Sequence, residues 1–339
     1  MPQTNDPAVV VVGASAGGVE ALRDLVSAFP LDLEACVLVV LHIPPTGTSA
    51  LPAILDRAGP LPARHAVEGD RLEQGRILVA PPNRHLVVAD GAVTLSRGPQ
   101  ENGHRPAVDV LFRSAARAQG PGVVGVVLSG SLDDGAAGAV AVKQRGGTAL
   151  VQDFDEALHD GMPRAAAAAA EIDAVLPVKK LAARVAELVR DRRTDAPPVS
   201  RLMNLEADMA DLDPSAMHHH ERPGDPSGFG CPDCHGALFE IHEGDMLRYR
   251  CRVGHAWSAE SLVARQTVSM ESALWMALRS LEEKAALNSE LGVRAAAGGR
   301  DLTAMRFRES EQETLRAAEL VRSLIDDLGE VPPKAPTPQ

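Results

Sequence analysis

The sequence lacks any apolar run approaching the roughly 20 residues that a membrane-spanning helix needs, so we expect no membrane insertion. It also lacks an excess of basic residues. With 34 Lys and Arg against 46 Asp and Glu, the formal net charge of -12 argues against a nucleic-acid partner and gives no indication of binding to an anionic membrane surface. The N-terminus has no basic stretch followed by an apolar segment and a small-residue cleavage site, so we expect no signal peptide.

Cysteine is also scarce. Only four occur in 339 residues, and three of them lie close together at Cys231, Cys234 and Cys251. An odd cluster of three thiols does not suit a disulfide framework. Cys36 stands alone in an apolar run and is expected to be a small core residue. We therefore expect a cytoplasmic protein, because thiols stay reduced in that compartment.

The chain does contain an alternation of short apolar runs and amphipathic stretches across residues 8–190. Runs such as 9–12 and 36–41 are apolar without polar alternation, which indicates strands buried on both faces of a parallel sheet. The stretches between such runs have helical spacing. The pattern predicts an α/β fold with a doubly wound, mostly parallel sheet, and an inserted hairpin at residues 86–95.

The composition changes several times after the α/β region, and these changes predict the domain boundaries. A segment rich in Pro, Asp, Ser and His reads as a linker, and two long helical patterns near the end predict a helical hairpin. The predicted units are an α/β domain at 1–193, a linker at 194–228, a Cys/His module at 229–257, a helical hairpin at 258–330 and a disordered tail at 331–339.

A G-x-S-x-G spacing follows the first predicted strand, with Ser15 at its centre. The glycines permit a sharp turn that lifts the serine hydroxyl clear of the backbone. The amide of Ala16 would then point at an oxyanion beside a helix N-terminus. A dinucleotide pyrophosphate is an alternative occupant of such a turn. It is disfavoured because the first two glycines of the G-x-G-x-x-G spacing are missing.

Two more polar groups follow buried strands. His42 comes after the second predicted strand, and Asp133 and Asp134 come shortly after a later one. Taken singly, His42 reads as a buried structural histidine and the Asp-Asp-Gly sequence as a turn or helix start. Taken together with Ser15, they provide an imidazole to accept the serine proton and a carboxylate to orient that imidazole. The pattern predicts a serine hydrolase whose chain order, Ser-His-Asp, differs from that of the α/β-hydrolases.

Longer motifs around these residues occur in one order along the chain. They are Val-Gly-Ala-Ser-Ala-Gly-Gly around Ser15, Leu-His-Ile-Pro-Pro around His42, Ala-Pro-Pro-Asn-Arg-His at 80–85, His-Arg-Pro-Ala-Val-Asp-Val-Leu-Phe at 104–112, Leu-Ser-Gly at 128–130, Asp-Gly-Ala-Ala-Gly at 134–138 and Gly-Met-Pro at 161–163. Together they resemble the catalytic domain of the bacterial chemotaxis protein-glutamate methylesterases, the CheB type, over about residues 8–190.

This resemblance implies that Ser15 is the nucleophile, His42 the general base and Asp134 its orienting carboxylate. It implies hydrolysis of glutamate γ-methyl esters on methylated chemoreceptors through an acyl-enzyme, with deamidation of glutamine at such sites and no cofactor for catalysis. It also implies oxyanion donors at the backbone amides of Ala16 and Ser131. The matching Asp-Gly-Ala-Ala-Gly sequence favours Asp134 over its neighbour as the triad carboxylate.

The sequence departs from the family pattern in two places. Gly-Ser-Leu at 130–132 stands where Gly-Met-Gly is common, which alters one wall of the cleft and puts the Ser131 amide in question. The familiar form of the family also carries an N-terminal receiver domain. Because the first strand begins near Ala8, we expect no receiver domain here and no gating by phosphorylation of this chain. A recognition or scaffold module without turnover is the alternative function, and it does not need an intact triad.

A second constellation lies in the Cys/His module. Cys231 and Cys234 form one close-spaced pair, and Cys251 and His255 form another, which suits a closed tetrahedral Cys₃His site for a structural Zn²⁺. Short strands are expected between the pairs, as in a zinc ribbon. The alternative is three free thiols and a surface histidine. The histidines at 218–220 lie in the predicted linker and are expected to be solvated.

The remaining expectations concern partners and structural residues. The C-terminal helices carry apolar stripes that either pack on each other or form a homodimer or dock a partner helix; the residues are Leu262, Val268, Leu274, Trp275, Leu278, Leu315, Leu320 and Leu324. Arg105 and Asp109 match the family but are expected to form a structural ion pair or a helix cap. His65, His85 and His159 are expected in loops or at the surface.

Overall fold

The computed structural model describes residues 7–191, 195–211, 224–243 and 246–329. The histidines at 218–220 and the expected disordered tail therefore lie outside the described residues. The chain separates into two compact units, Met1–Leu262 and Val263–Gln339. Among the described residues, no helix combines the length and the apolar character that crossing a membrane requires.

A seven-stranded parallel sheet forms the centre of the first unit, and its strand order is β3-β4-β2-β1-β7-β8-β9. The strands are β1 (Ala8–Ala14), β2 (Ala35–Leu41), β3 (Ala63–His65), β4 (Arg76–Val79), β7 (Val123–Val127), β8 (Thr148–Gln152) and β9 (Ala174–Leu176). Strands β2, β3 and β4 lie on one side of β1, and β7, β8 and β9 lie on the other. The direction in which strands are added therefore reverses between β1 and β7. That reversal is a topological switch point, where loops from neighbouring strands converge.

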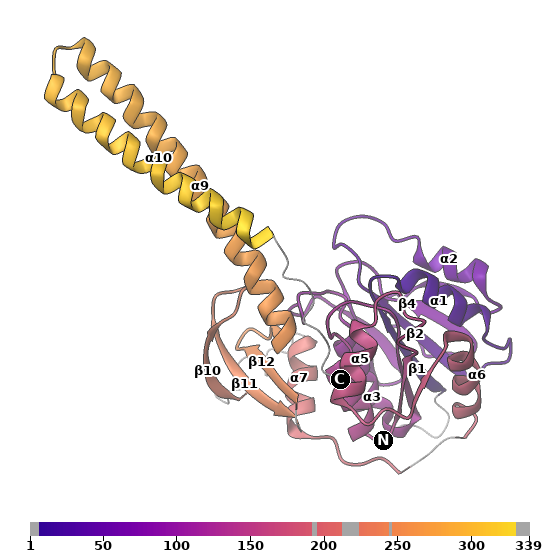
Figure 1. Ribbon diagram of the computed structural model, residues 1–339. Helices are drawn as coiled ribbons and strands as arrows, with labels where there is room; N and C mark the ends of the chain where they lie inside the picture. The colour runs from indigo at the N-terminus through magenta and orange to yellow at the C-terminus, as the bar shows by residue number, and fades with distance from the viewer. Residues whose placement is uncertain (1–6, 192–194, 212–223, 244–245, 330–339) are drawn as a thin grey trace, which may run out of the picture. The chain divides into compact units, whose positions relative to one another are not determined.

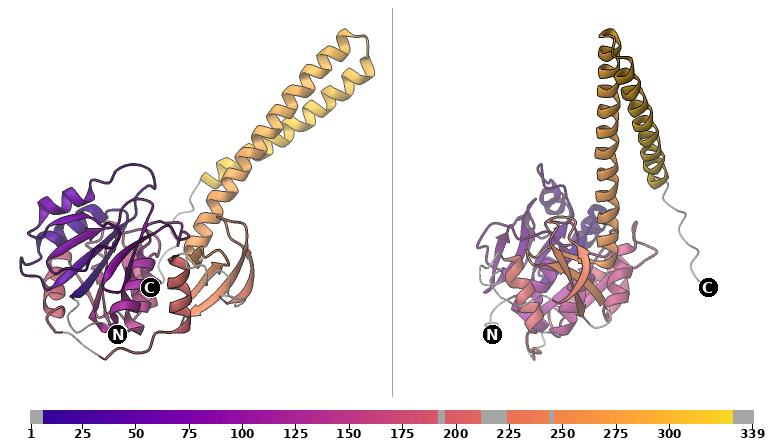
Figure 2. Two further views of the ribbon diagram at one scale, coloured as in Figure 1. Left: turned by 180° about the vertical axis from the view of Figure 1, so that it is seen from behind. Right: turned by 90° about the vertical axis from the view of Figure 1, so that its left-hand side faces the viewer.

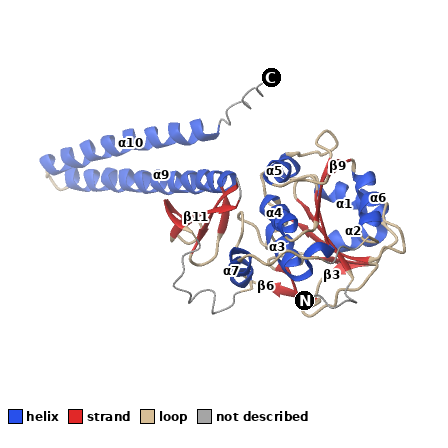
Figure 3. Cartoon of the chain, turned by 90° about the horizontal axis from the view of Figure 1, so that it is seen from below, coloured by secondary structure: helices blue, strands red, loops and turns tan. Residues whose placement is uncertain are grey.

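Helices cover both faces of this sheet (Figures 1 and 3). The helices are α1 (Gly18–Ser27), α2 (Leu51–Ala58) and α6 (Val178–Leu188) on one face, and α3 (Val108–Gln119), α4 (Ala136–Gln144) and α5 (Gly161–Ala169) on the other. Along β1, Val10 and Val12 pack towards α1, whereas Val9 and Val11 pack towards α3. Burial on both faces explains why the strands are apolar without alternation, and the predicted doubly wound α/β fold is confirmed.

The predicted hairpin is confirmed as an antiparallel pair, β5 (His85–Ala89) and β6 (Ala92–Ser96). Its Asp90-Gly91 turn has positive φ at both residues, 48° and 69°, as a two-residue hairpin turn requires. His85 is fully buried in this hairpin, so its expected place in a loop or at the surface is wrong. Its ring Nε2 contacts the carbonyl oxygen of Pro99, and its Nδ1 accepts from the amide of Ala107.

The segment expected to be a linker contains a helix, α7 (Arg201–Ala210). Ser200 caps it by accepting a hydrogen bond from the amide of Met203, at 3.1 Å. A four-stranded antiparallel sheet follows, formed by β10 (Asp225–Gly230), β11 (Ala237–Glu243), β12 (Met246–Cys251) and β13 (Ala256–Ser258). This sheet carries the Cys/His module and belongs to the same compact unit as the parallel sheet.

Two long helices account for the second unit, and Figure 2 shows them side by side as a hairpin. They are α9 (Ala259–Ala297), whose first turn belongs to the first unit, and α10 (Asp301–Gly329). Their shared core contains Leu278, Ala318 and Ile325. Leu262 packs inside the Cys/His module instead of in this hairpin. Several other expected stripe residues remain exposed: Val268, Trp275, Leu315, Leu320 and Leu324.

Candidate functional site

Ser15 lies directly beyond β1, at the turn that leads into α1. Its amide donates to the carbonyl of Ser129, and its carbonyl accepts from the amide of Gly18, both at 2.9 Å. Gly17 caps α1 with a left-handed φ of 71°, a conformation that glycine adopts without steric cost. The turn therefore ties the serine to the loop after β7 and holds its hydroxyl beside the N-terminus of a helix.

His42 follows β2 and lies between Ser15 and Asp134. Its Nδ1 is 3.1 Å from the Ser15 hydroxyl oxygen, and its Nε2 is 2.7 Å from a carboxylate oxygen of Asp134. An ionised carboxylate only accepts, so Nε2 carries the proton and Nδ1 presents its lone pair to the serine. The three residues predicted from their strand-end positions thus form one hydrogen-bonded chain. They come from the ends of β1, β2 and β7, around the switch point of the sheet.

Asp134 is fixed by four hydrogen-bond donors. Besides His42, its carboxylate accepts from the amides of Val108 at 2.7 Å and Asp109 at 3.0 Å, and from the side-chain amide of Asn102 at 3.2 Å. Burial alone would raise the pKa of Asp134. The hydrogen bond and charge of His42, together with the Val108 amide, outweigh burial and hold that pKa below its usual range.

Asp109 forms no ion pair with Arg105 but does act as a helix cap, at the start of α4 instead of the helix that begins at Val108. It accepts from the amides of Gly135 and Gly138 at the start of α4, at 2.9 and 2.6 Å. Arg105 instead donates to the side chain of Asn83. Burial, and then the charge of Asp134, raise the pKa of Asp109 well above its usual value.

Two residues near the triad escaped the sequence reasoning. The ring of His104 stacks on the ring of His42, with centroids 3.6 Å apart and planes at 11°. Asn102 connects Asp134 to Asp109 through one side-chain nitrogen. His104 was visible only as part of a motif. Asn102 sits in an Asn-Gly pair, which signals a tight turn but not its location.

Asp133, the competitor of Asp134 in the sequence, faces away from the imidazole chain. Its carboxylate accepts from the hydroxyl of Ser261 at 2.7 Å. Burial raises its pKa. The hydrogen bond to His42 belongs to Asp134.

The expected oxyanion donors are the amide of Ala16, which follows Ser15, and the amide of Ser131, which follows Gly130 in the loop after β7. Within the described part of the chain, the backbone amides of Ala16 and Ser131 donate no hydrogen bond to another protein group. Gly130 lies so close to Ser15 that a Cβ there would be 2.9 Å from the serine Cβ and 2.0 Å from Sδ of Met162. A glycine at 130 therefore lets the loop after β7 approach the serine closely.

The Cys/His module brings its four predicted ligands together. The ligand atoms of Cys231, Cys234, Cys251 and His255 all lie within 4.8 Å of one another. The sulfur of Cys251 is 3.6 Å from that of Cys234 and 3.6 Å from Nδ1 of His255. Metal–sulfur bonds of about 2.3 Å in a tetrahedron separate two sulfur atoms by about 3.8 Å, so the cluster fits a four-coordinate ion.

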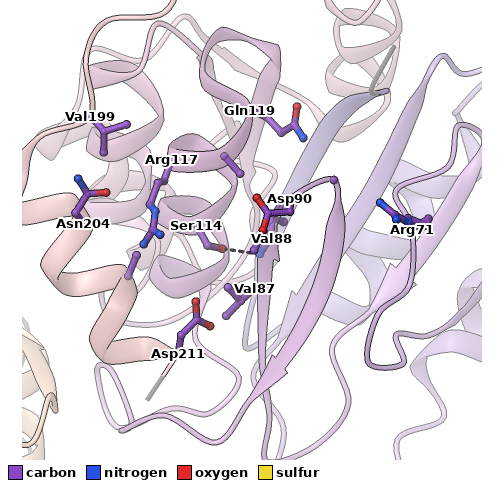
Figure 4. Close-up of a pocket in the computed structure, with 14 residues that line it drawn as sticks. Arg71, Val87, Val88, Asp90, Ser114, Arg117, Gln119, Val199, Asn204 and Asp211 are labelled. Carbon is purple, nitrogen blue, oxygen red and sulfur yellow. Dashed lines mark hydrogen bonds between the residues drawn. The ribbon is translucent and has the colours of Figure 1, made fainter. Parts of the chain in front are cut away.

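A cavity of about 450 Å³ lies elsewhere in the first unit, between the β5–β6 hairpin, α3 and α7 (Figure 4). Its lining includes Arg71, Ser114, Arg117 and Asn204. The hydroxyl of Ser114 accepts from the amide of Val88 across it. No triad residue lines this cavity, so it is separate from the Ser15 site.

A family model described as CheB methylesterase matches residues 10–185 of this chain. The chain belongs to the CheB methylesterase family. Ser15, His42 and Asp134 all lie within the matched residues, whereas the Cys/His cluster lies beyond them. The resemblance predicted from the motifs is therefore confirmed for the α/β region.

Individual members of the CheB methylesterase family agree with this assignment. The chain is 40% identical over 190 residues to protein-glutamate methylesterase/protein-glutamine glutaminase 2 of Methanosarcina mazei, covering 54% of this chain and 52% of that protein. It is 44% identical over 187 residues to protein-glutamate methylesterase/protein-glutamine glutaminase 1 of Anaeromyxobacter dehalogenans, covering 54% and 53%. The chain thus spans about half the length of the curated relatives it matches.

A solved structure shows the same CheB fold. The catalytic domain of Thermotoga maritima CheB methylesterase is 32% identical, with a TM-score of 0.52, and the match covers 54% of this chain and 98% of that one. The α/β region therefore corresponds to nearly all of a solved CheB catalytic domain.

Proposed function

We propose that this protein hydrolyses γ-methyl esters of glutamate residues in chemoreceptor-type signalling proteins, with Ser15 as nucleophile, and that it deamidates glutamine at such sites. The observation that carries the proposal is the hydrogen-bonded chain from Ser15 through His42 to Asp134. The printed names of relatives at about 40% identity supply the two activities. A recognition module without turnover would have no need of this arrangement.

The proposed reaction follows from the protonation states of the triad. Nδ1 of His42 takes the proton of the Ser15 hydroxyl as its oxygen attacks the ester carbonyl carbon. The imidazolium is stabilised by the ionised Asp134 and then gives its proton to the departing methoxide oxygen, so that methanol leaves and the acyl-enzyme remains. Water next attacks the acyl-enzyme with His42 again as base, and glutamate and free Ser15 result. With glutamine, ammonia leaves in place of methanol.

The amides of Ala16 and Ser131 are the proposed oxyanion donors. Both lie in turns next to Ser15 and keep free N–H groups within the described part of the chain. Each such donor contributes about 10²–10³ to kcat in comparable acyl-transfer sites. The N-terminus of α1 adds a favourable field for the developing negative charge.

Two exposed leucines near the site suit an amphipathic helix as substrate. Leu132 follows Ser131 and is 39% exposed, and Leu158 is 73% exposed. A Cβ at Gly17 would lie 2.8 Å from the Cβ of Leu158, which places that side chain beside the Ser15 turn. We propose that both leucines contact the apolar side of a methylated receptor helix. This is the partner that the family relationship makes plausible.

For the Cys/His cluster we propose a structural Zn²⁺. Four protein ligands leave no open position for substrate, so the ion would contribute to folding of the module and not to the chemistry. This requires thiolates at Cys231, Cys234 and Cys251, and hence a reducing compartment such as the cytoplasm. About one zinc per chain is expected after dialysis against a weak chelator. Cys36→Ala should retain it and Cys251→Ser should lose it; a metal-free wild type would overturn the assignment.

For the second unit we propose self-association. The α9–α10 hairpin leaves Trp275, Leu315 and Leu320 exposed, although such residues are normally buried. A second copy of the hairpin would cover them. Light scattering should give the mass of a dimer for the full chain and of a monomer for Trp275→Glu combined with Leu320→Glu. A monomeric wild type would contradict this proposal.

The experiment that tests the main proposal is mass spectrometry of methylated chemoreceptors incubated with the protein. Receptor peptides should lose glutamyl methyl esters, and glutamine at the same positions should become glutamate. Ser15→Ala serves as the matched control and should leave both untouched. If the wild type leaves the receptor peptides unchanged, the proposed function fails for those receptors.

A further inference from the structure

A four-residue turn lies between the triad and the Cys/His module. The amide of Glu101 donates to the carbonyl of His104, and the amide of His104 donates back to the carbonyl of Glu101, at 3.2 and 2.9 Å. The central residues, Asn102 and Gly103, have φ values of 52° and 76°. Left-handed conformation at both positions is the signature of a type I′ turn, which Asn-Gly favours.

One side of this turn is held by β13 of the module. The amide of Asn102 donates to the carbonyl of Ala256 at 2.8 Å, and the amide of Ser258 donates to the side-chain oxygen of Asn102 at 3.0 Å. Between these contacts, the ring of Trp257 lies over Gly103 and is 1% exposed. The turn is therefore continuous with the module's sheet.

The other side of the turn meets the triad. The side-chain nitrogen of Asn102 donates to Asp134 at 3.2 Å and to Asp109 at 3.0 Å. His104 stacks on the imidazole of His42. One amide side chain thus accepts from the module and donates to the triad carboxylate.

A buried cluster of charges fixes the module in this position. Arg250 of β12 donates to Glu101 and to Glu206 of α7, each at 2.8 Å, and Arg113 of α3 donates to Glu101 at 2.6 Å. Arg248 donates to both carboxylate oxygens of Glu206 at 2.9 Å. Removal of one partner from a buried pair of this kind leaves an uncompensated buried charge, so the cluster resists separation of β12 from α3 and α7. Arg250 directly precedes the proposed metal ligand Cys251 and is paired with Glu101 of the turn. A metal ion that fixes Cys251 would therefore also restrict the position of Arg250 and, through it, the turn.

We propose that the Cys/His module is a positioning element of the active site, which sets the orientation of Asp134 through Asn102 and the plane of His42 through His104. Asn102 is the positioning residue at the centre of this link. The inference rests on the proposed function, because orienting Asp134 and His42 matters for turnover only if these residues act in ester hydrolysis. It gives the module a role in turnover without contact with substrate.

The first test compares variants of the full-length protein on a peptide containing glutamate γ-methyl ester, followed by methanol release. Asn102→Gly keeps the left-handed turn but removes the amide, and Asn102→Asp keeps the acceptor for Ser258 while removing the donor to Asp134. We expect kcat to fall at least about tenfold in both, with KM within about twofold. Asp90→Gly, at the first position of the other two-residue turn, is the matched control and should keep wild-type kcat.

A purely structural role would lower the melting temperature of the Asn102 variants and leave kcat of the folded protein unchanged, and that result overturns the inference. Removal of the metal is the second test. Chelator-treated protein should lose kcat at least about tenfold in step with the melting transition of the module, and added Zn²⁺ should restore both. Unchanged kcat after the metal has been lost also overturns the inference. A wild type that fails to turn over more ester than Ser15→Ala contradicts instead the proposed function.

Discussion

Asp134 and Asp109 cap each other's helices. Asp134 precedes α4 and accepts from the first two amides of α3, while Asp109 in α3 accepts from two amides at the start of α4. The exchange satisfies helix-end donors that would otherwise lack partners in the core. It also restrains rotation of the Asp134 carboxylate, because turning it would break both of its hydrogen bonds to the amides of α3. Orientation of His42 is thus built into the packing of α3 against α4.

Replacement of Asp134 by Asn tests the role of that carboxylate. The neutral asparagine side chain cannot stabilise an imidazolium. Its NH₂ group would also place a hydrogen-bond donor against the N–H of His42 or against an α3 amide, where the carboxylate oxygens now accept. We expect kcat for ester hydrolysis to fall about 10²–10⁴-fold, with a smaller change in KM. Asp133→Asn is the neighbouring control and should stay within about tenfold of wild-type kcat. A larger fall in kcat for Asp133→Asn than for Asp134→Asn would show that Asp133, and not Asp134, is the carboxylate of the triad.

Gly130→Ala tests the close approach behind Ser15. The added Cβ would overlap Met162 and press on the serine Cβ. We expect kcat to fall at least about tenfold, because even a small displacement of the Ser15 hydroxyl from its position for attack slows the reaction strongly. Gly122→Ala is the control, since nothing lies within 4 Å of a Cβ at that position. Wild-type kcat in Gly130→Ala would show that the loop after β7 adjusts without moving Ser15.

Glu206→Gln tests the buried charge cluster that holds the module. The change leaves the buried guanidinium groups of Arg248 and Arg250 without their shared carboxylate. We expect the free energy of unfolding of the first unit to drop by about 3–5 kcal/mol, measured in urea. Glu187→Gln removes an exposed pairing with Arg184 in the same unit and should change that free energy by less than about 0.5 kcal/mol. Equal effects would mean that the cluster contributes no more than a surface pair.

Stability should fall in acid. Burial opposes ionisation of Glu206, but the charges of Arg248 and Arg250 outweigh it and hold the pKa of Glu206 below its usual range, as His42 does for Asp134. A carboxyl group whose pKa is lower in the folded state stabilises the fold above its unfolded pKa of about 4 and loses that contribution as the pH falls further. Urea titrations should show a falling free energy of unfolding below about pH 4. Glu206→Gln should show a shallower slope there, and an identical slope would contradict the assignment to Glu206.

The sequence was sufficient to predict the parallel sheet and the strand-end positions of Ser15, His42 and Asp134. Apolar runs buried on both faces leave a clear pattern, and groups that follow such strands must meet at one edge of the sheet. The four cysteine and histidine positions were equally readable, because metal-ligand pairs are close in sequence.

Other features depend on contacts that no local pattern encodes. α7 has buried residues at helical spacing, such as Met203 and Ala207, but it is short and lies in a polar segment, and its Glu206 bonds to arginines more than 40 positions away. Asn102 bonds to Asp134 and to the amide of Ser258, which is 156 positions distant. The Asn-Gly pair indicated a turn there. Its place between the module and the triad follows only from tertiary packing.

Methanol release from a peptide containing glutamate γ-methyl ester, by the wild type and by Ser15→Ala, tests the central claim most directly. The two proteins differ by one oxygen atom at the proposed nucleophile, and matched circular dichroism and melting curves would establish that both are folded. We predict steady release by the wild type and a rate at least about 10³-fold lower for Ser15→Ala. Equal rates from the two folded proteins would contradict the account.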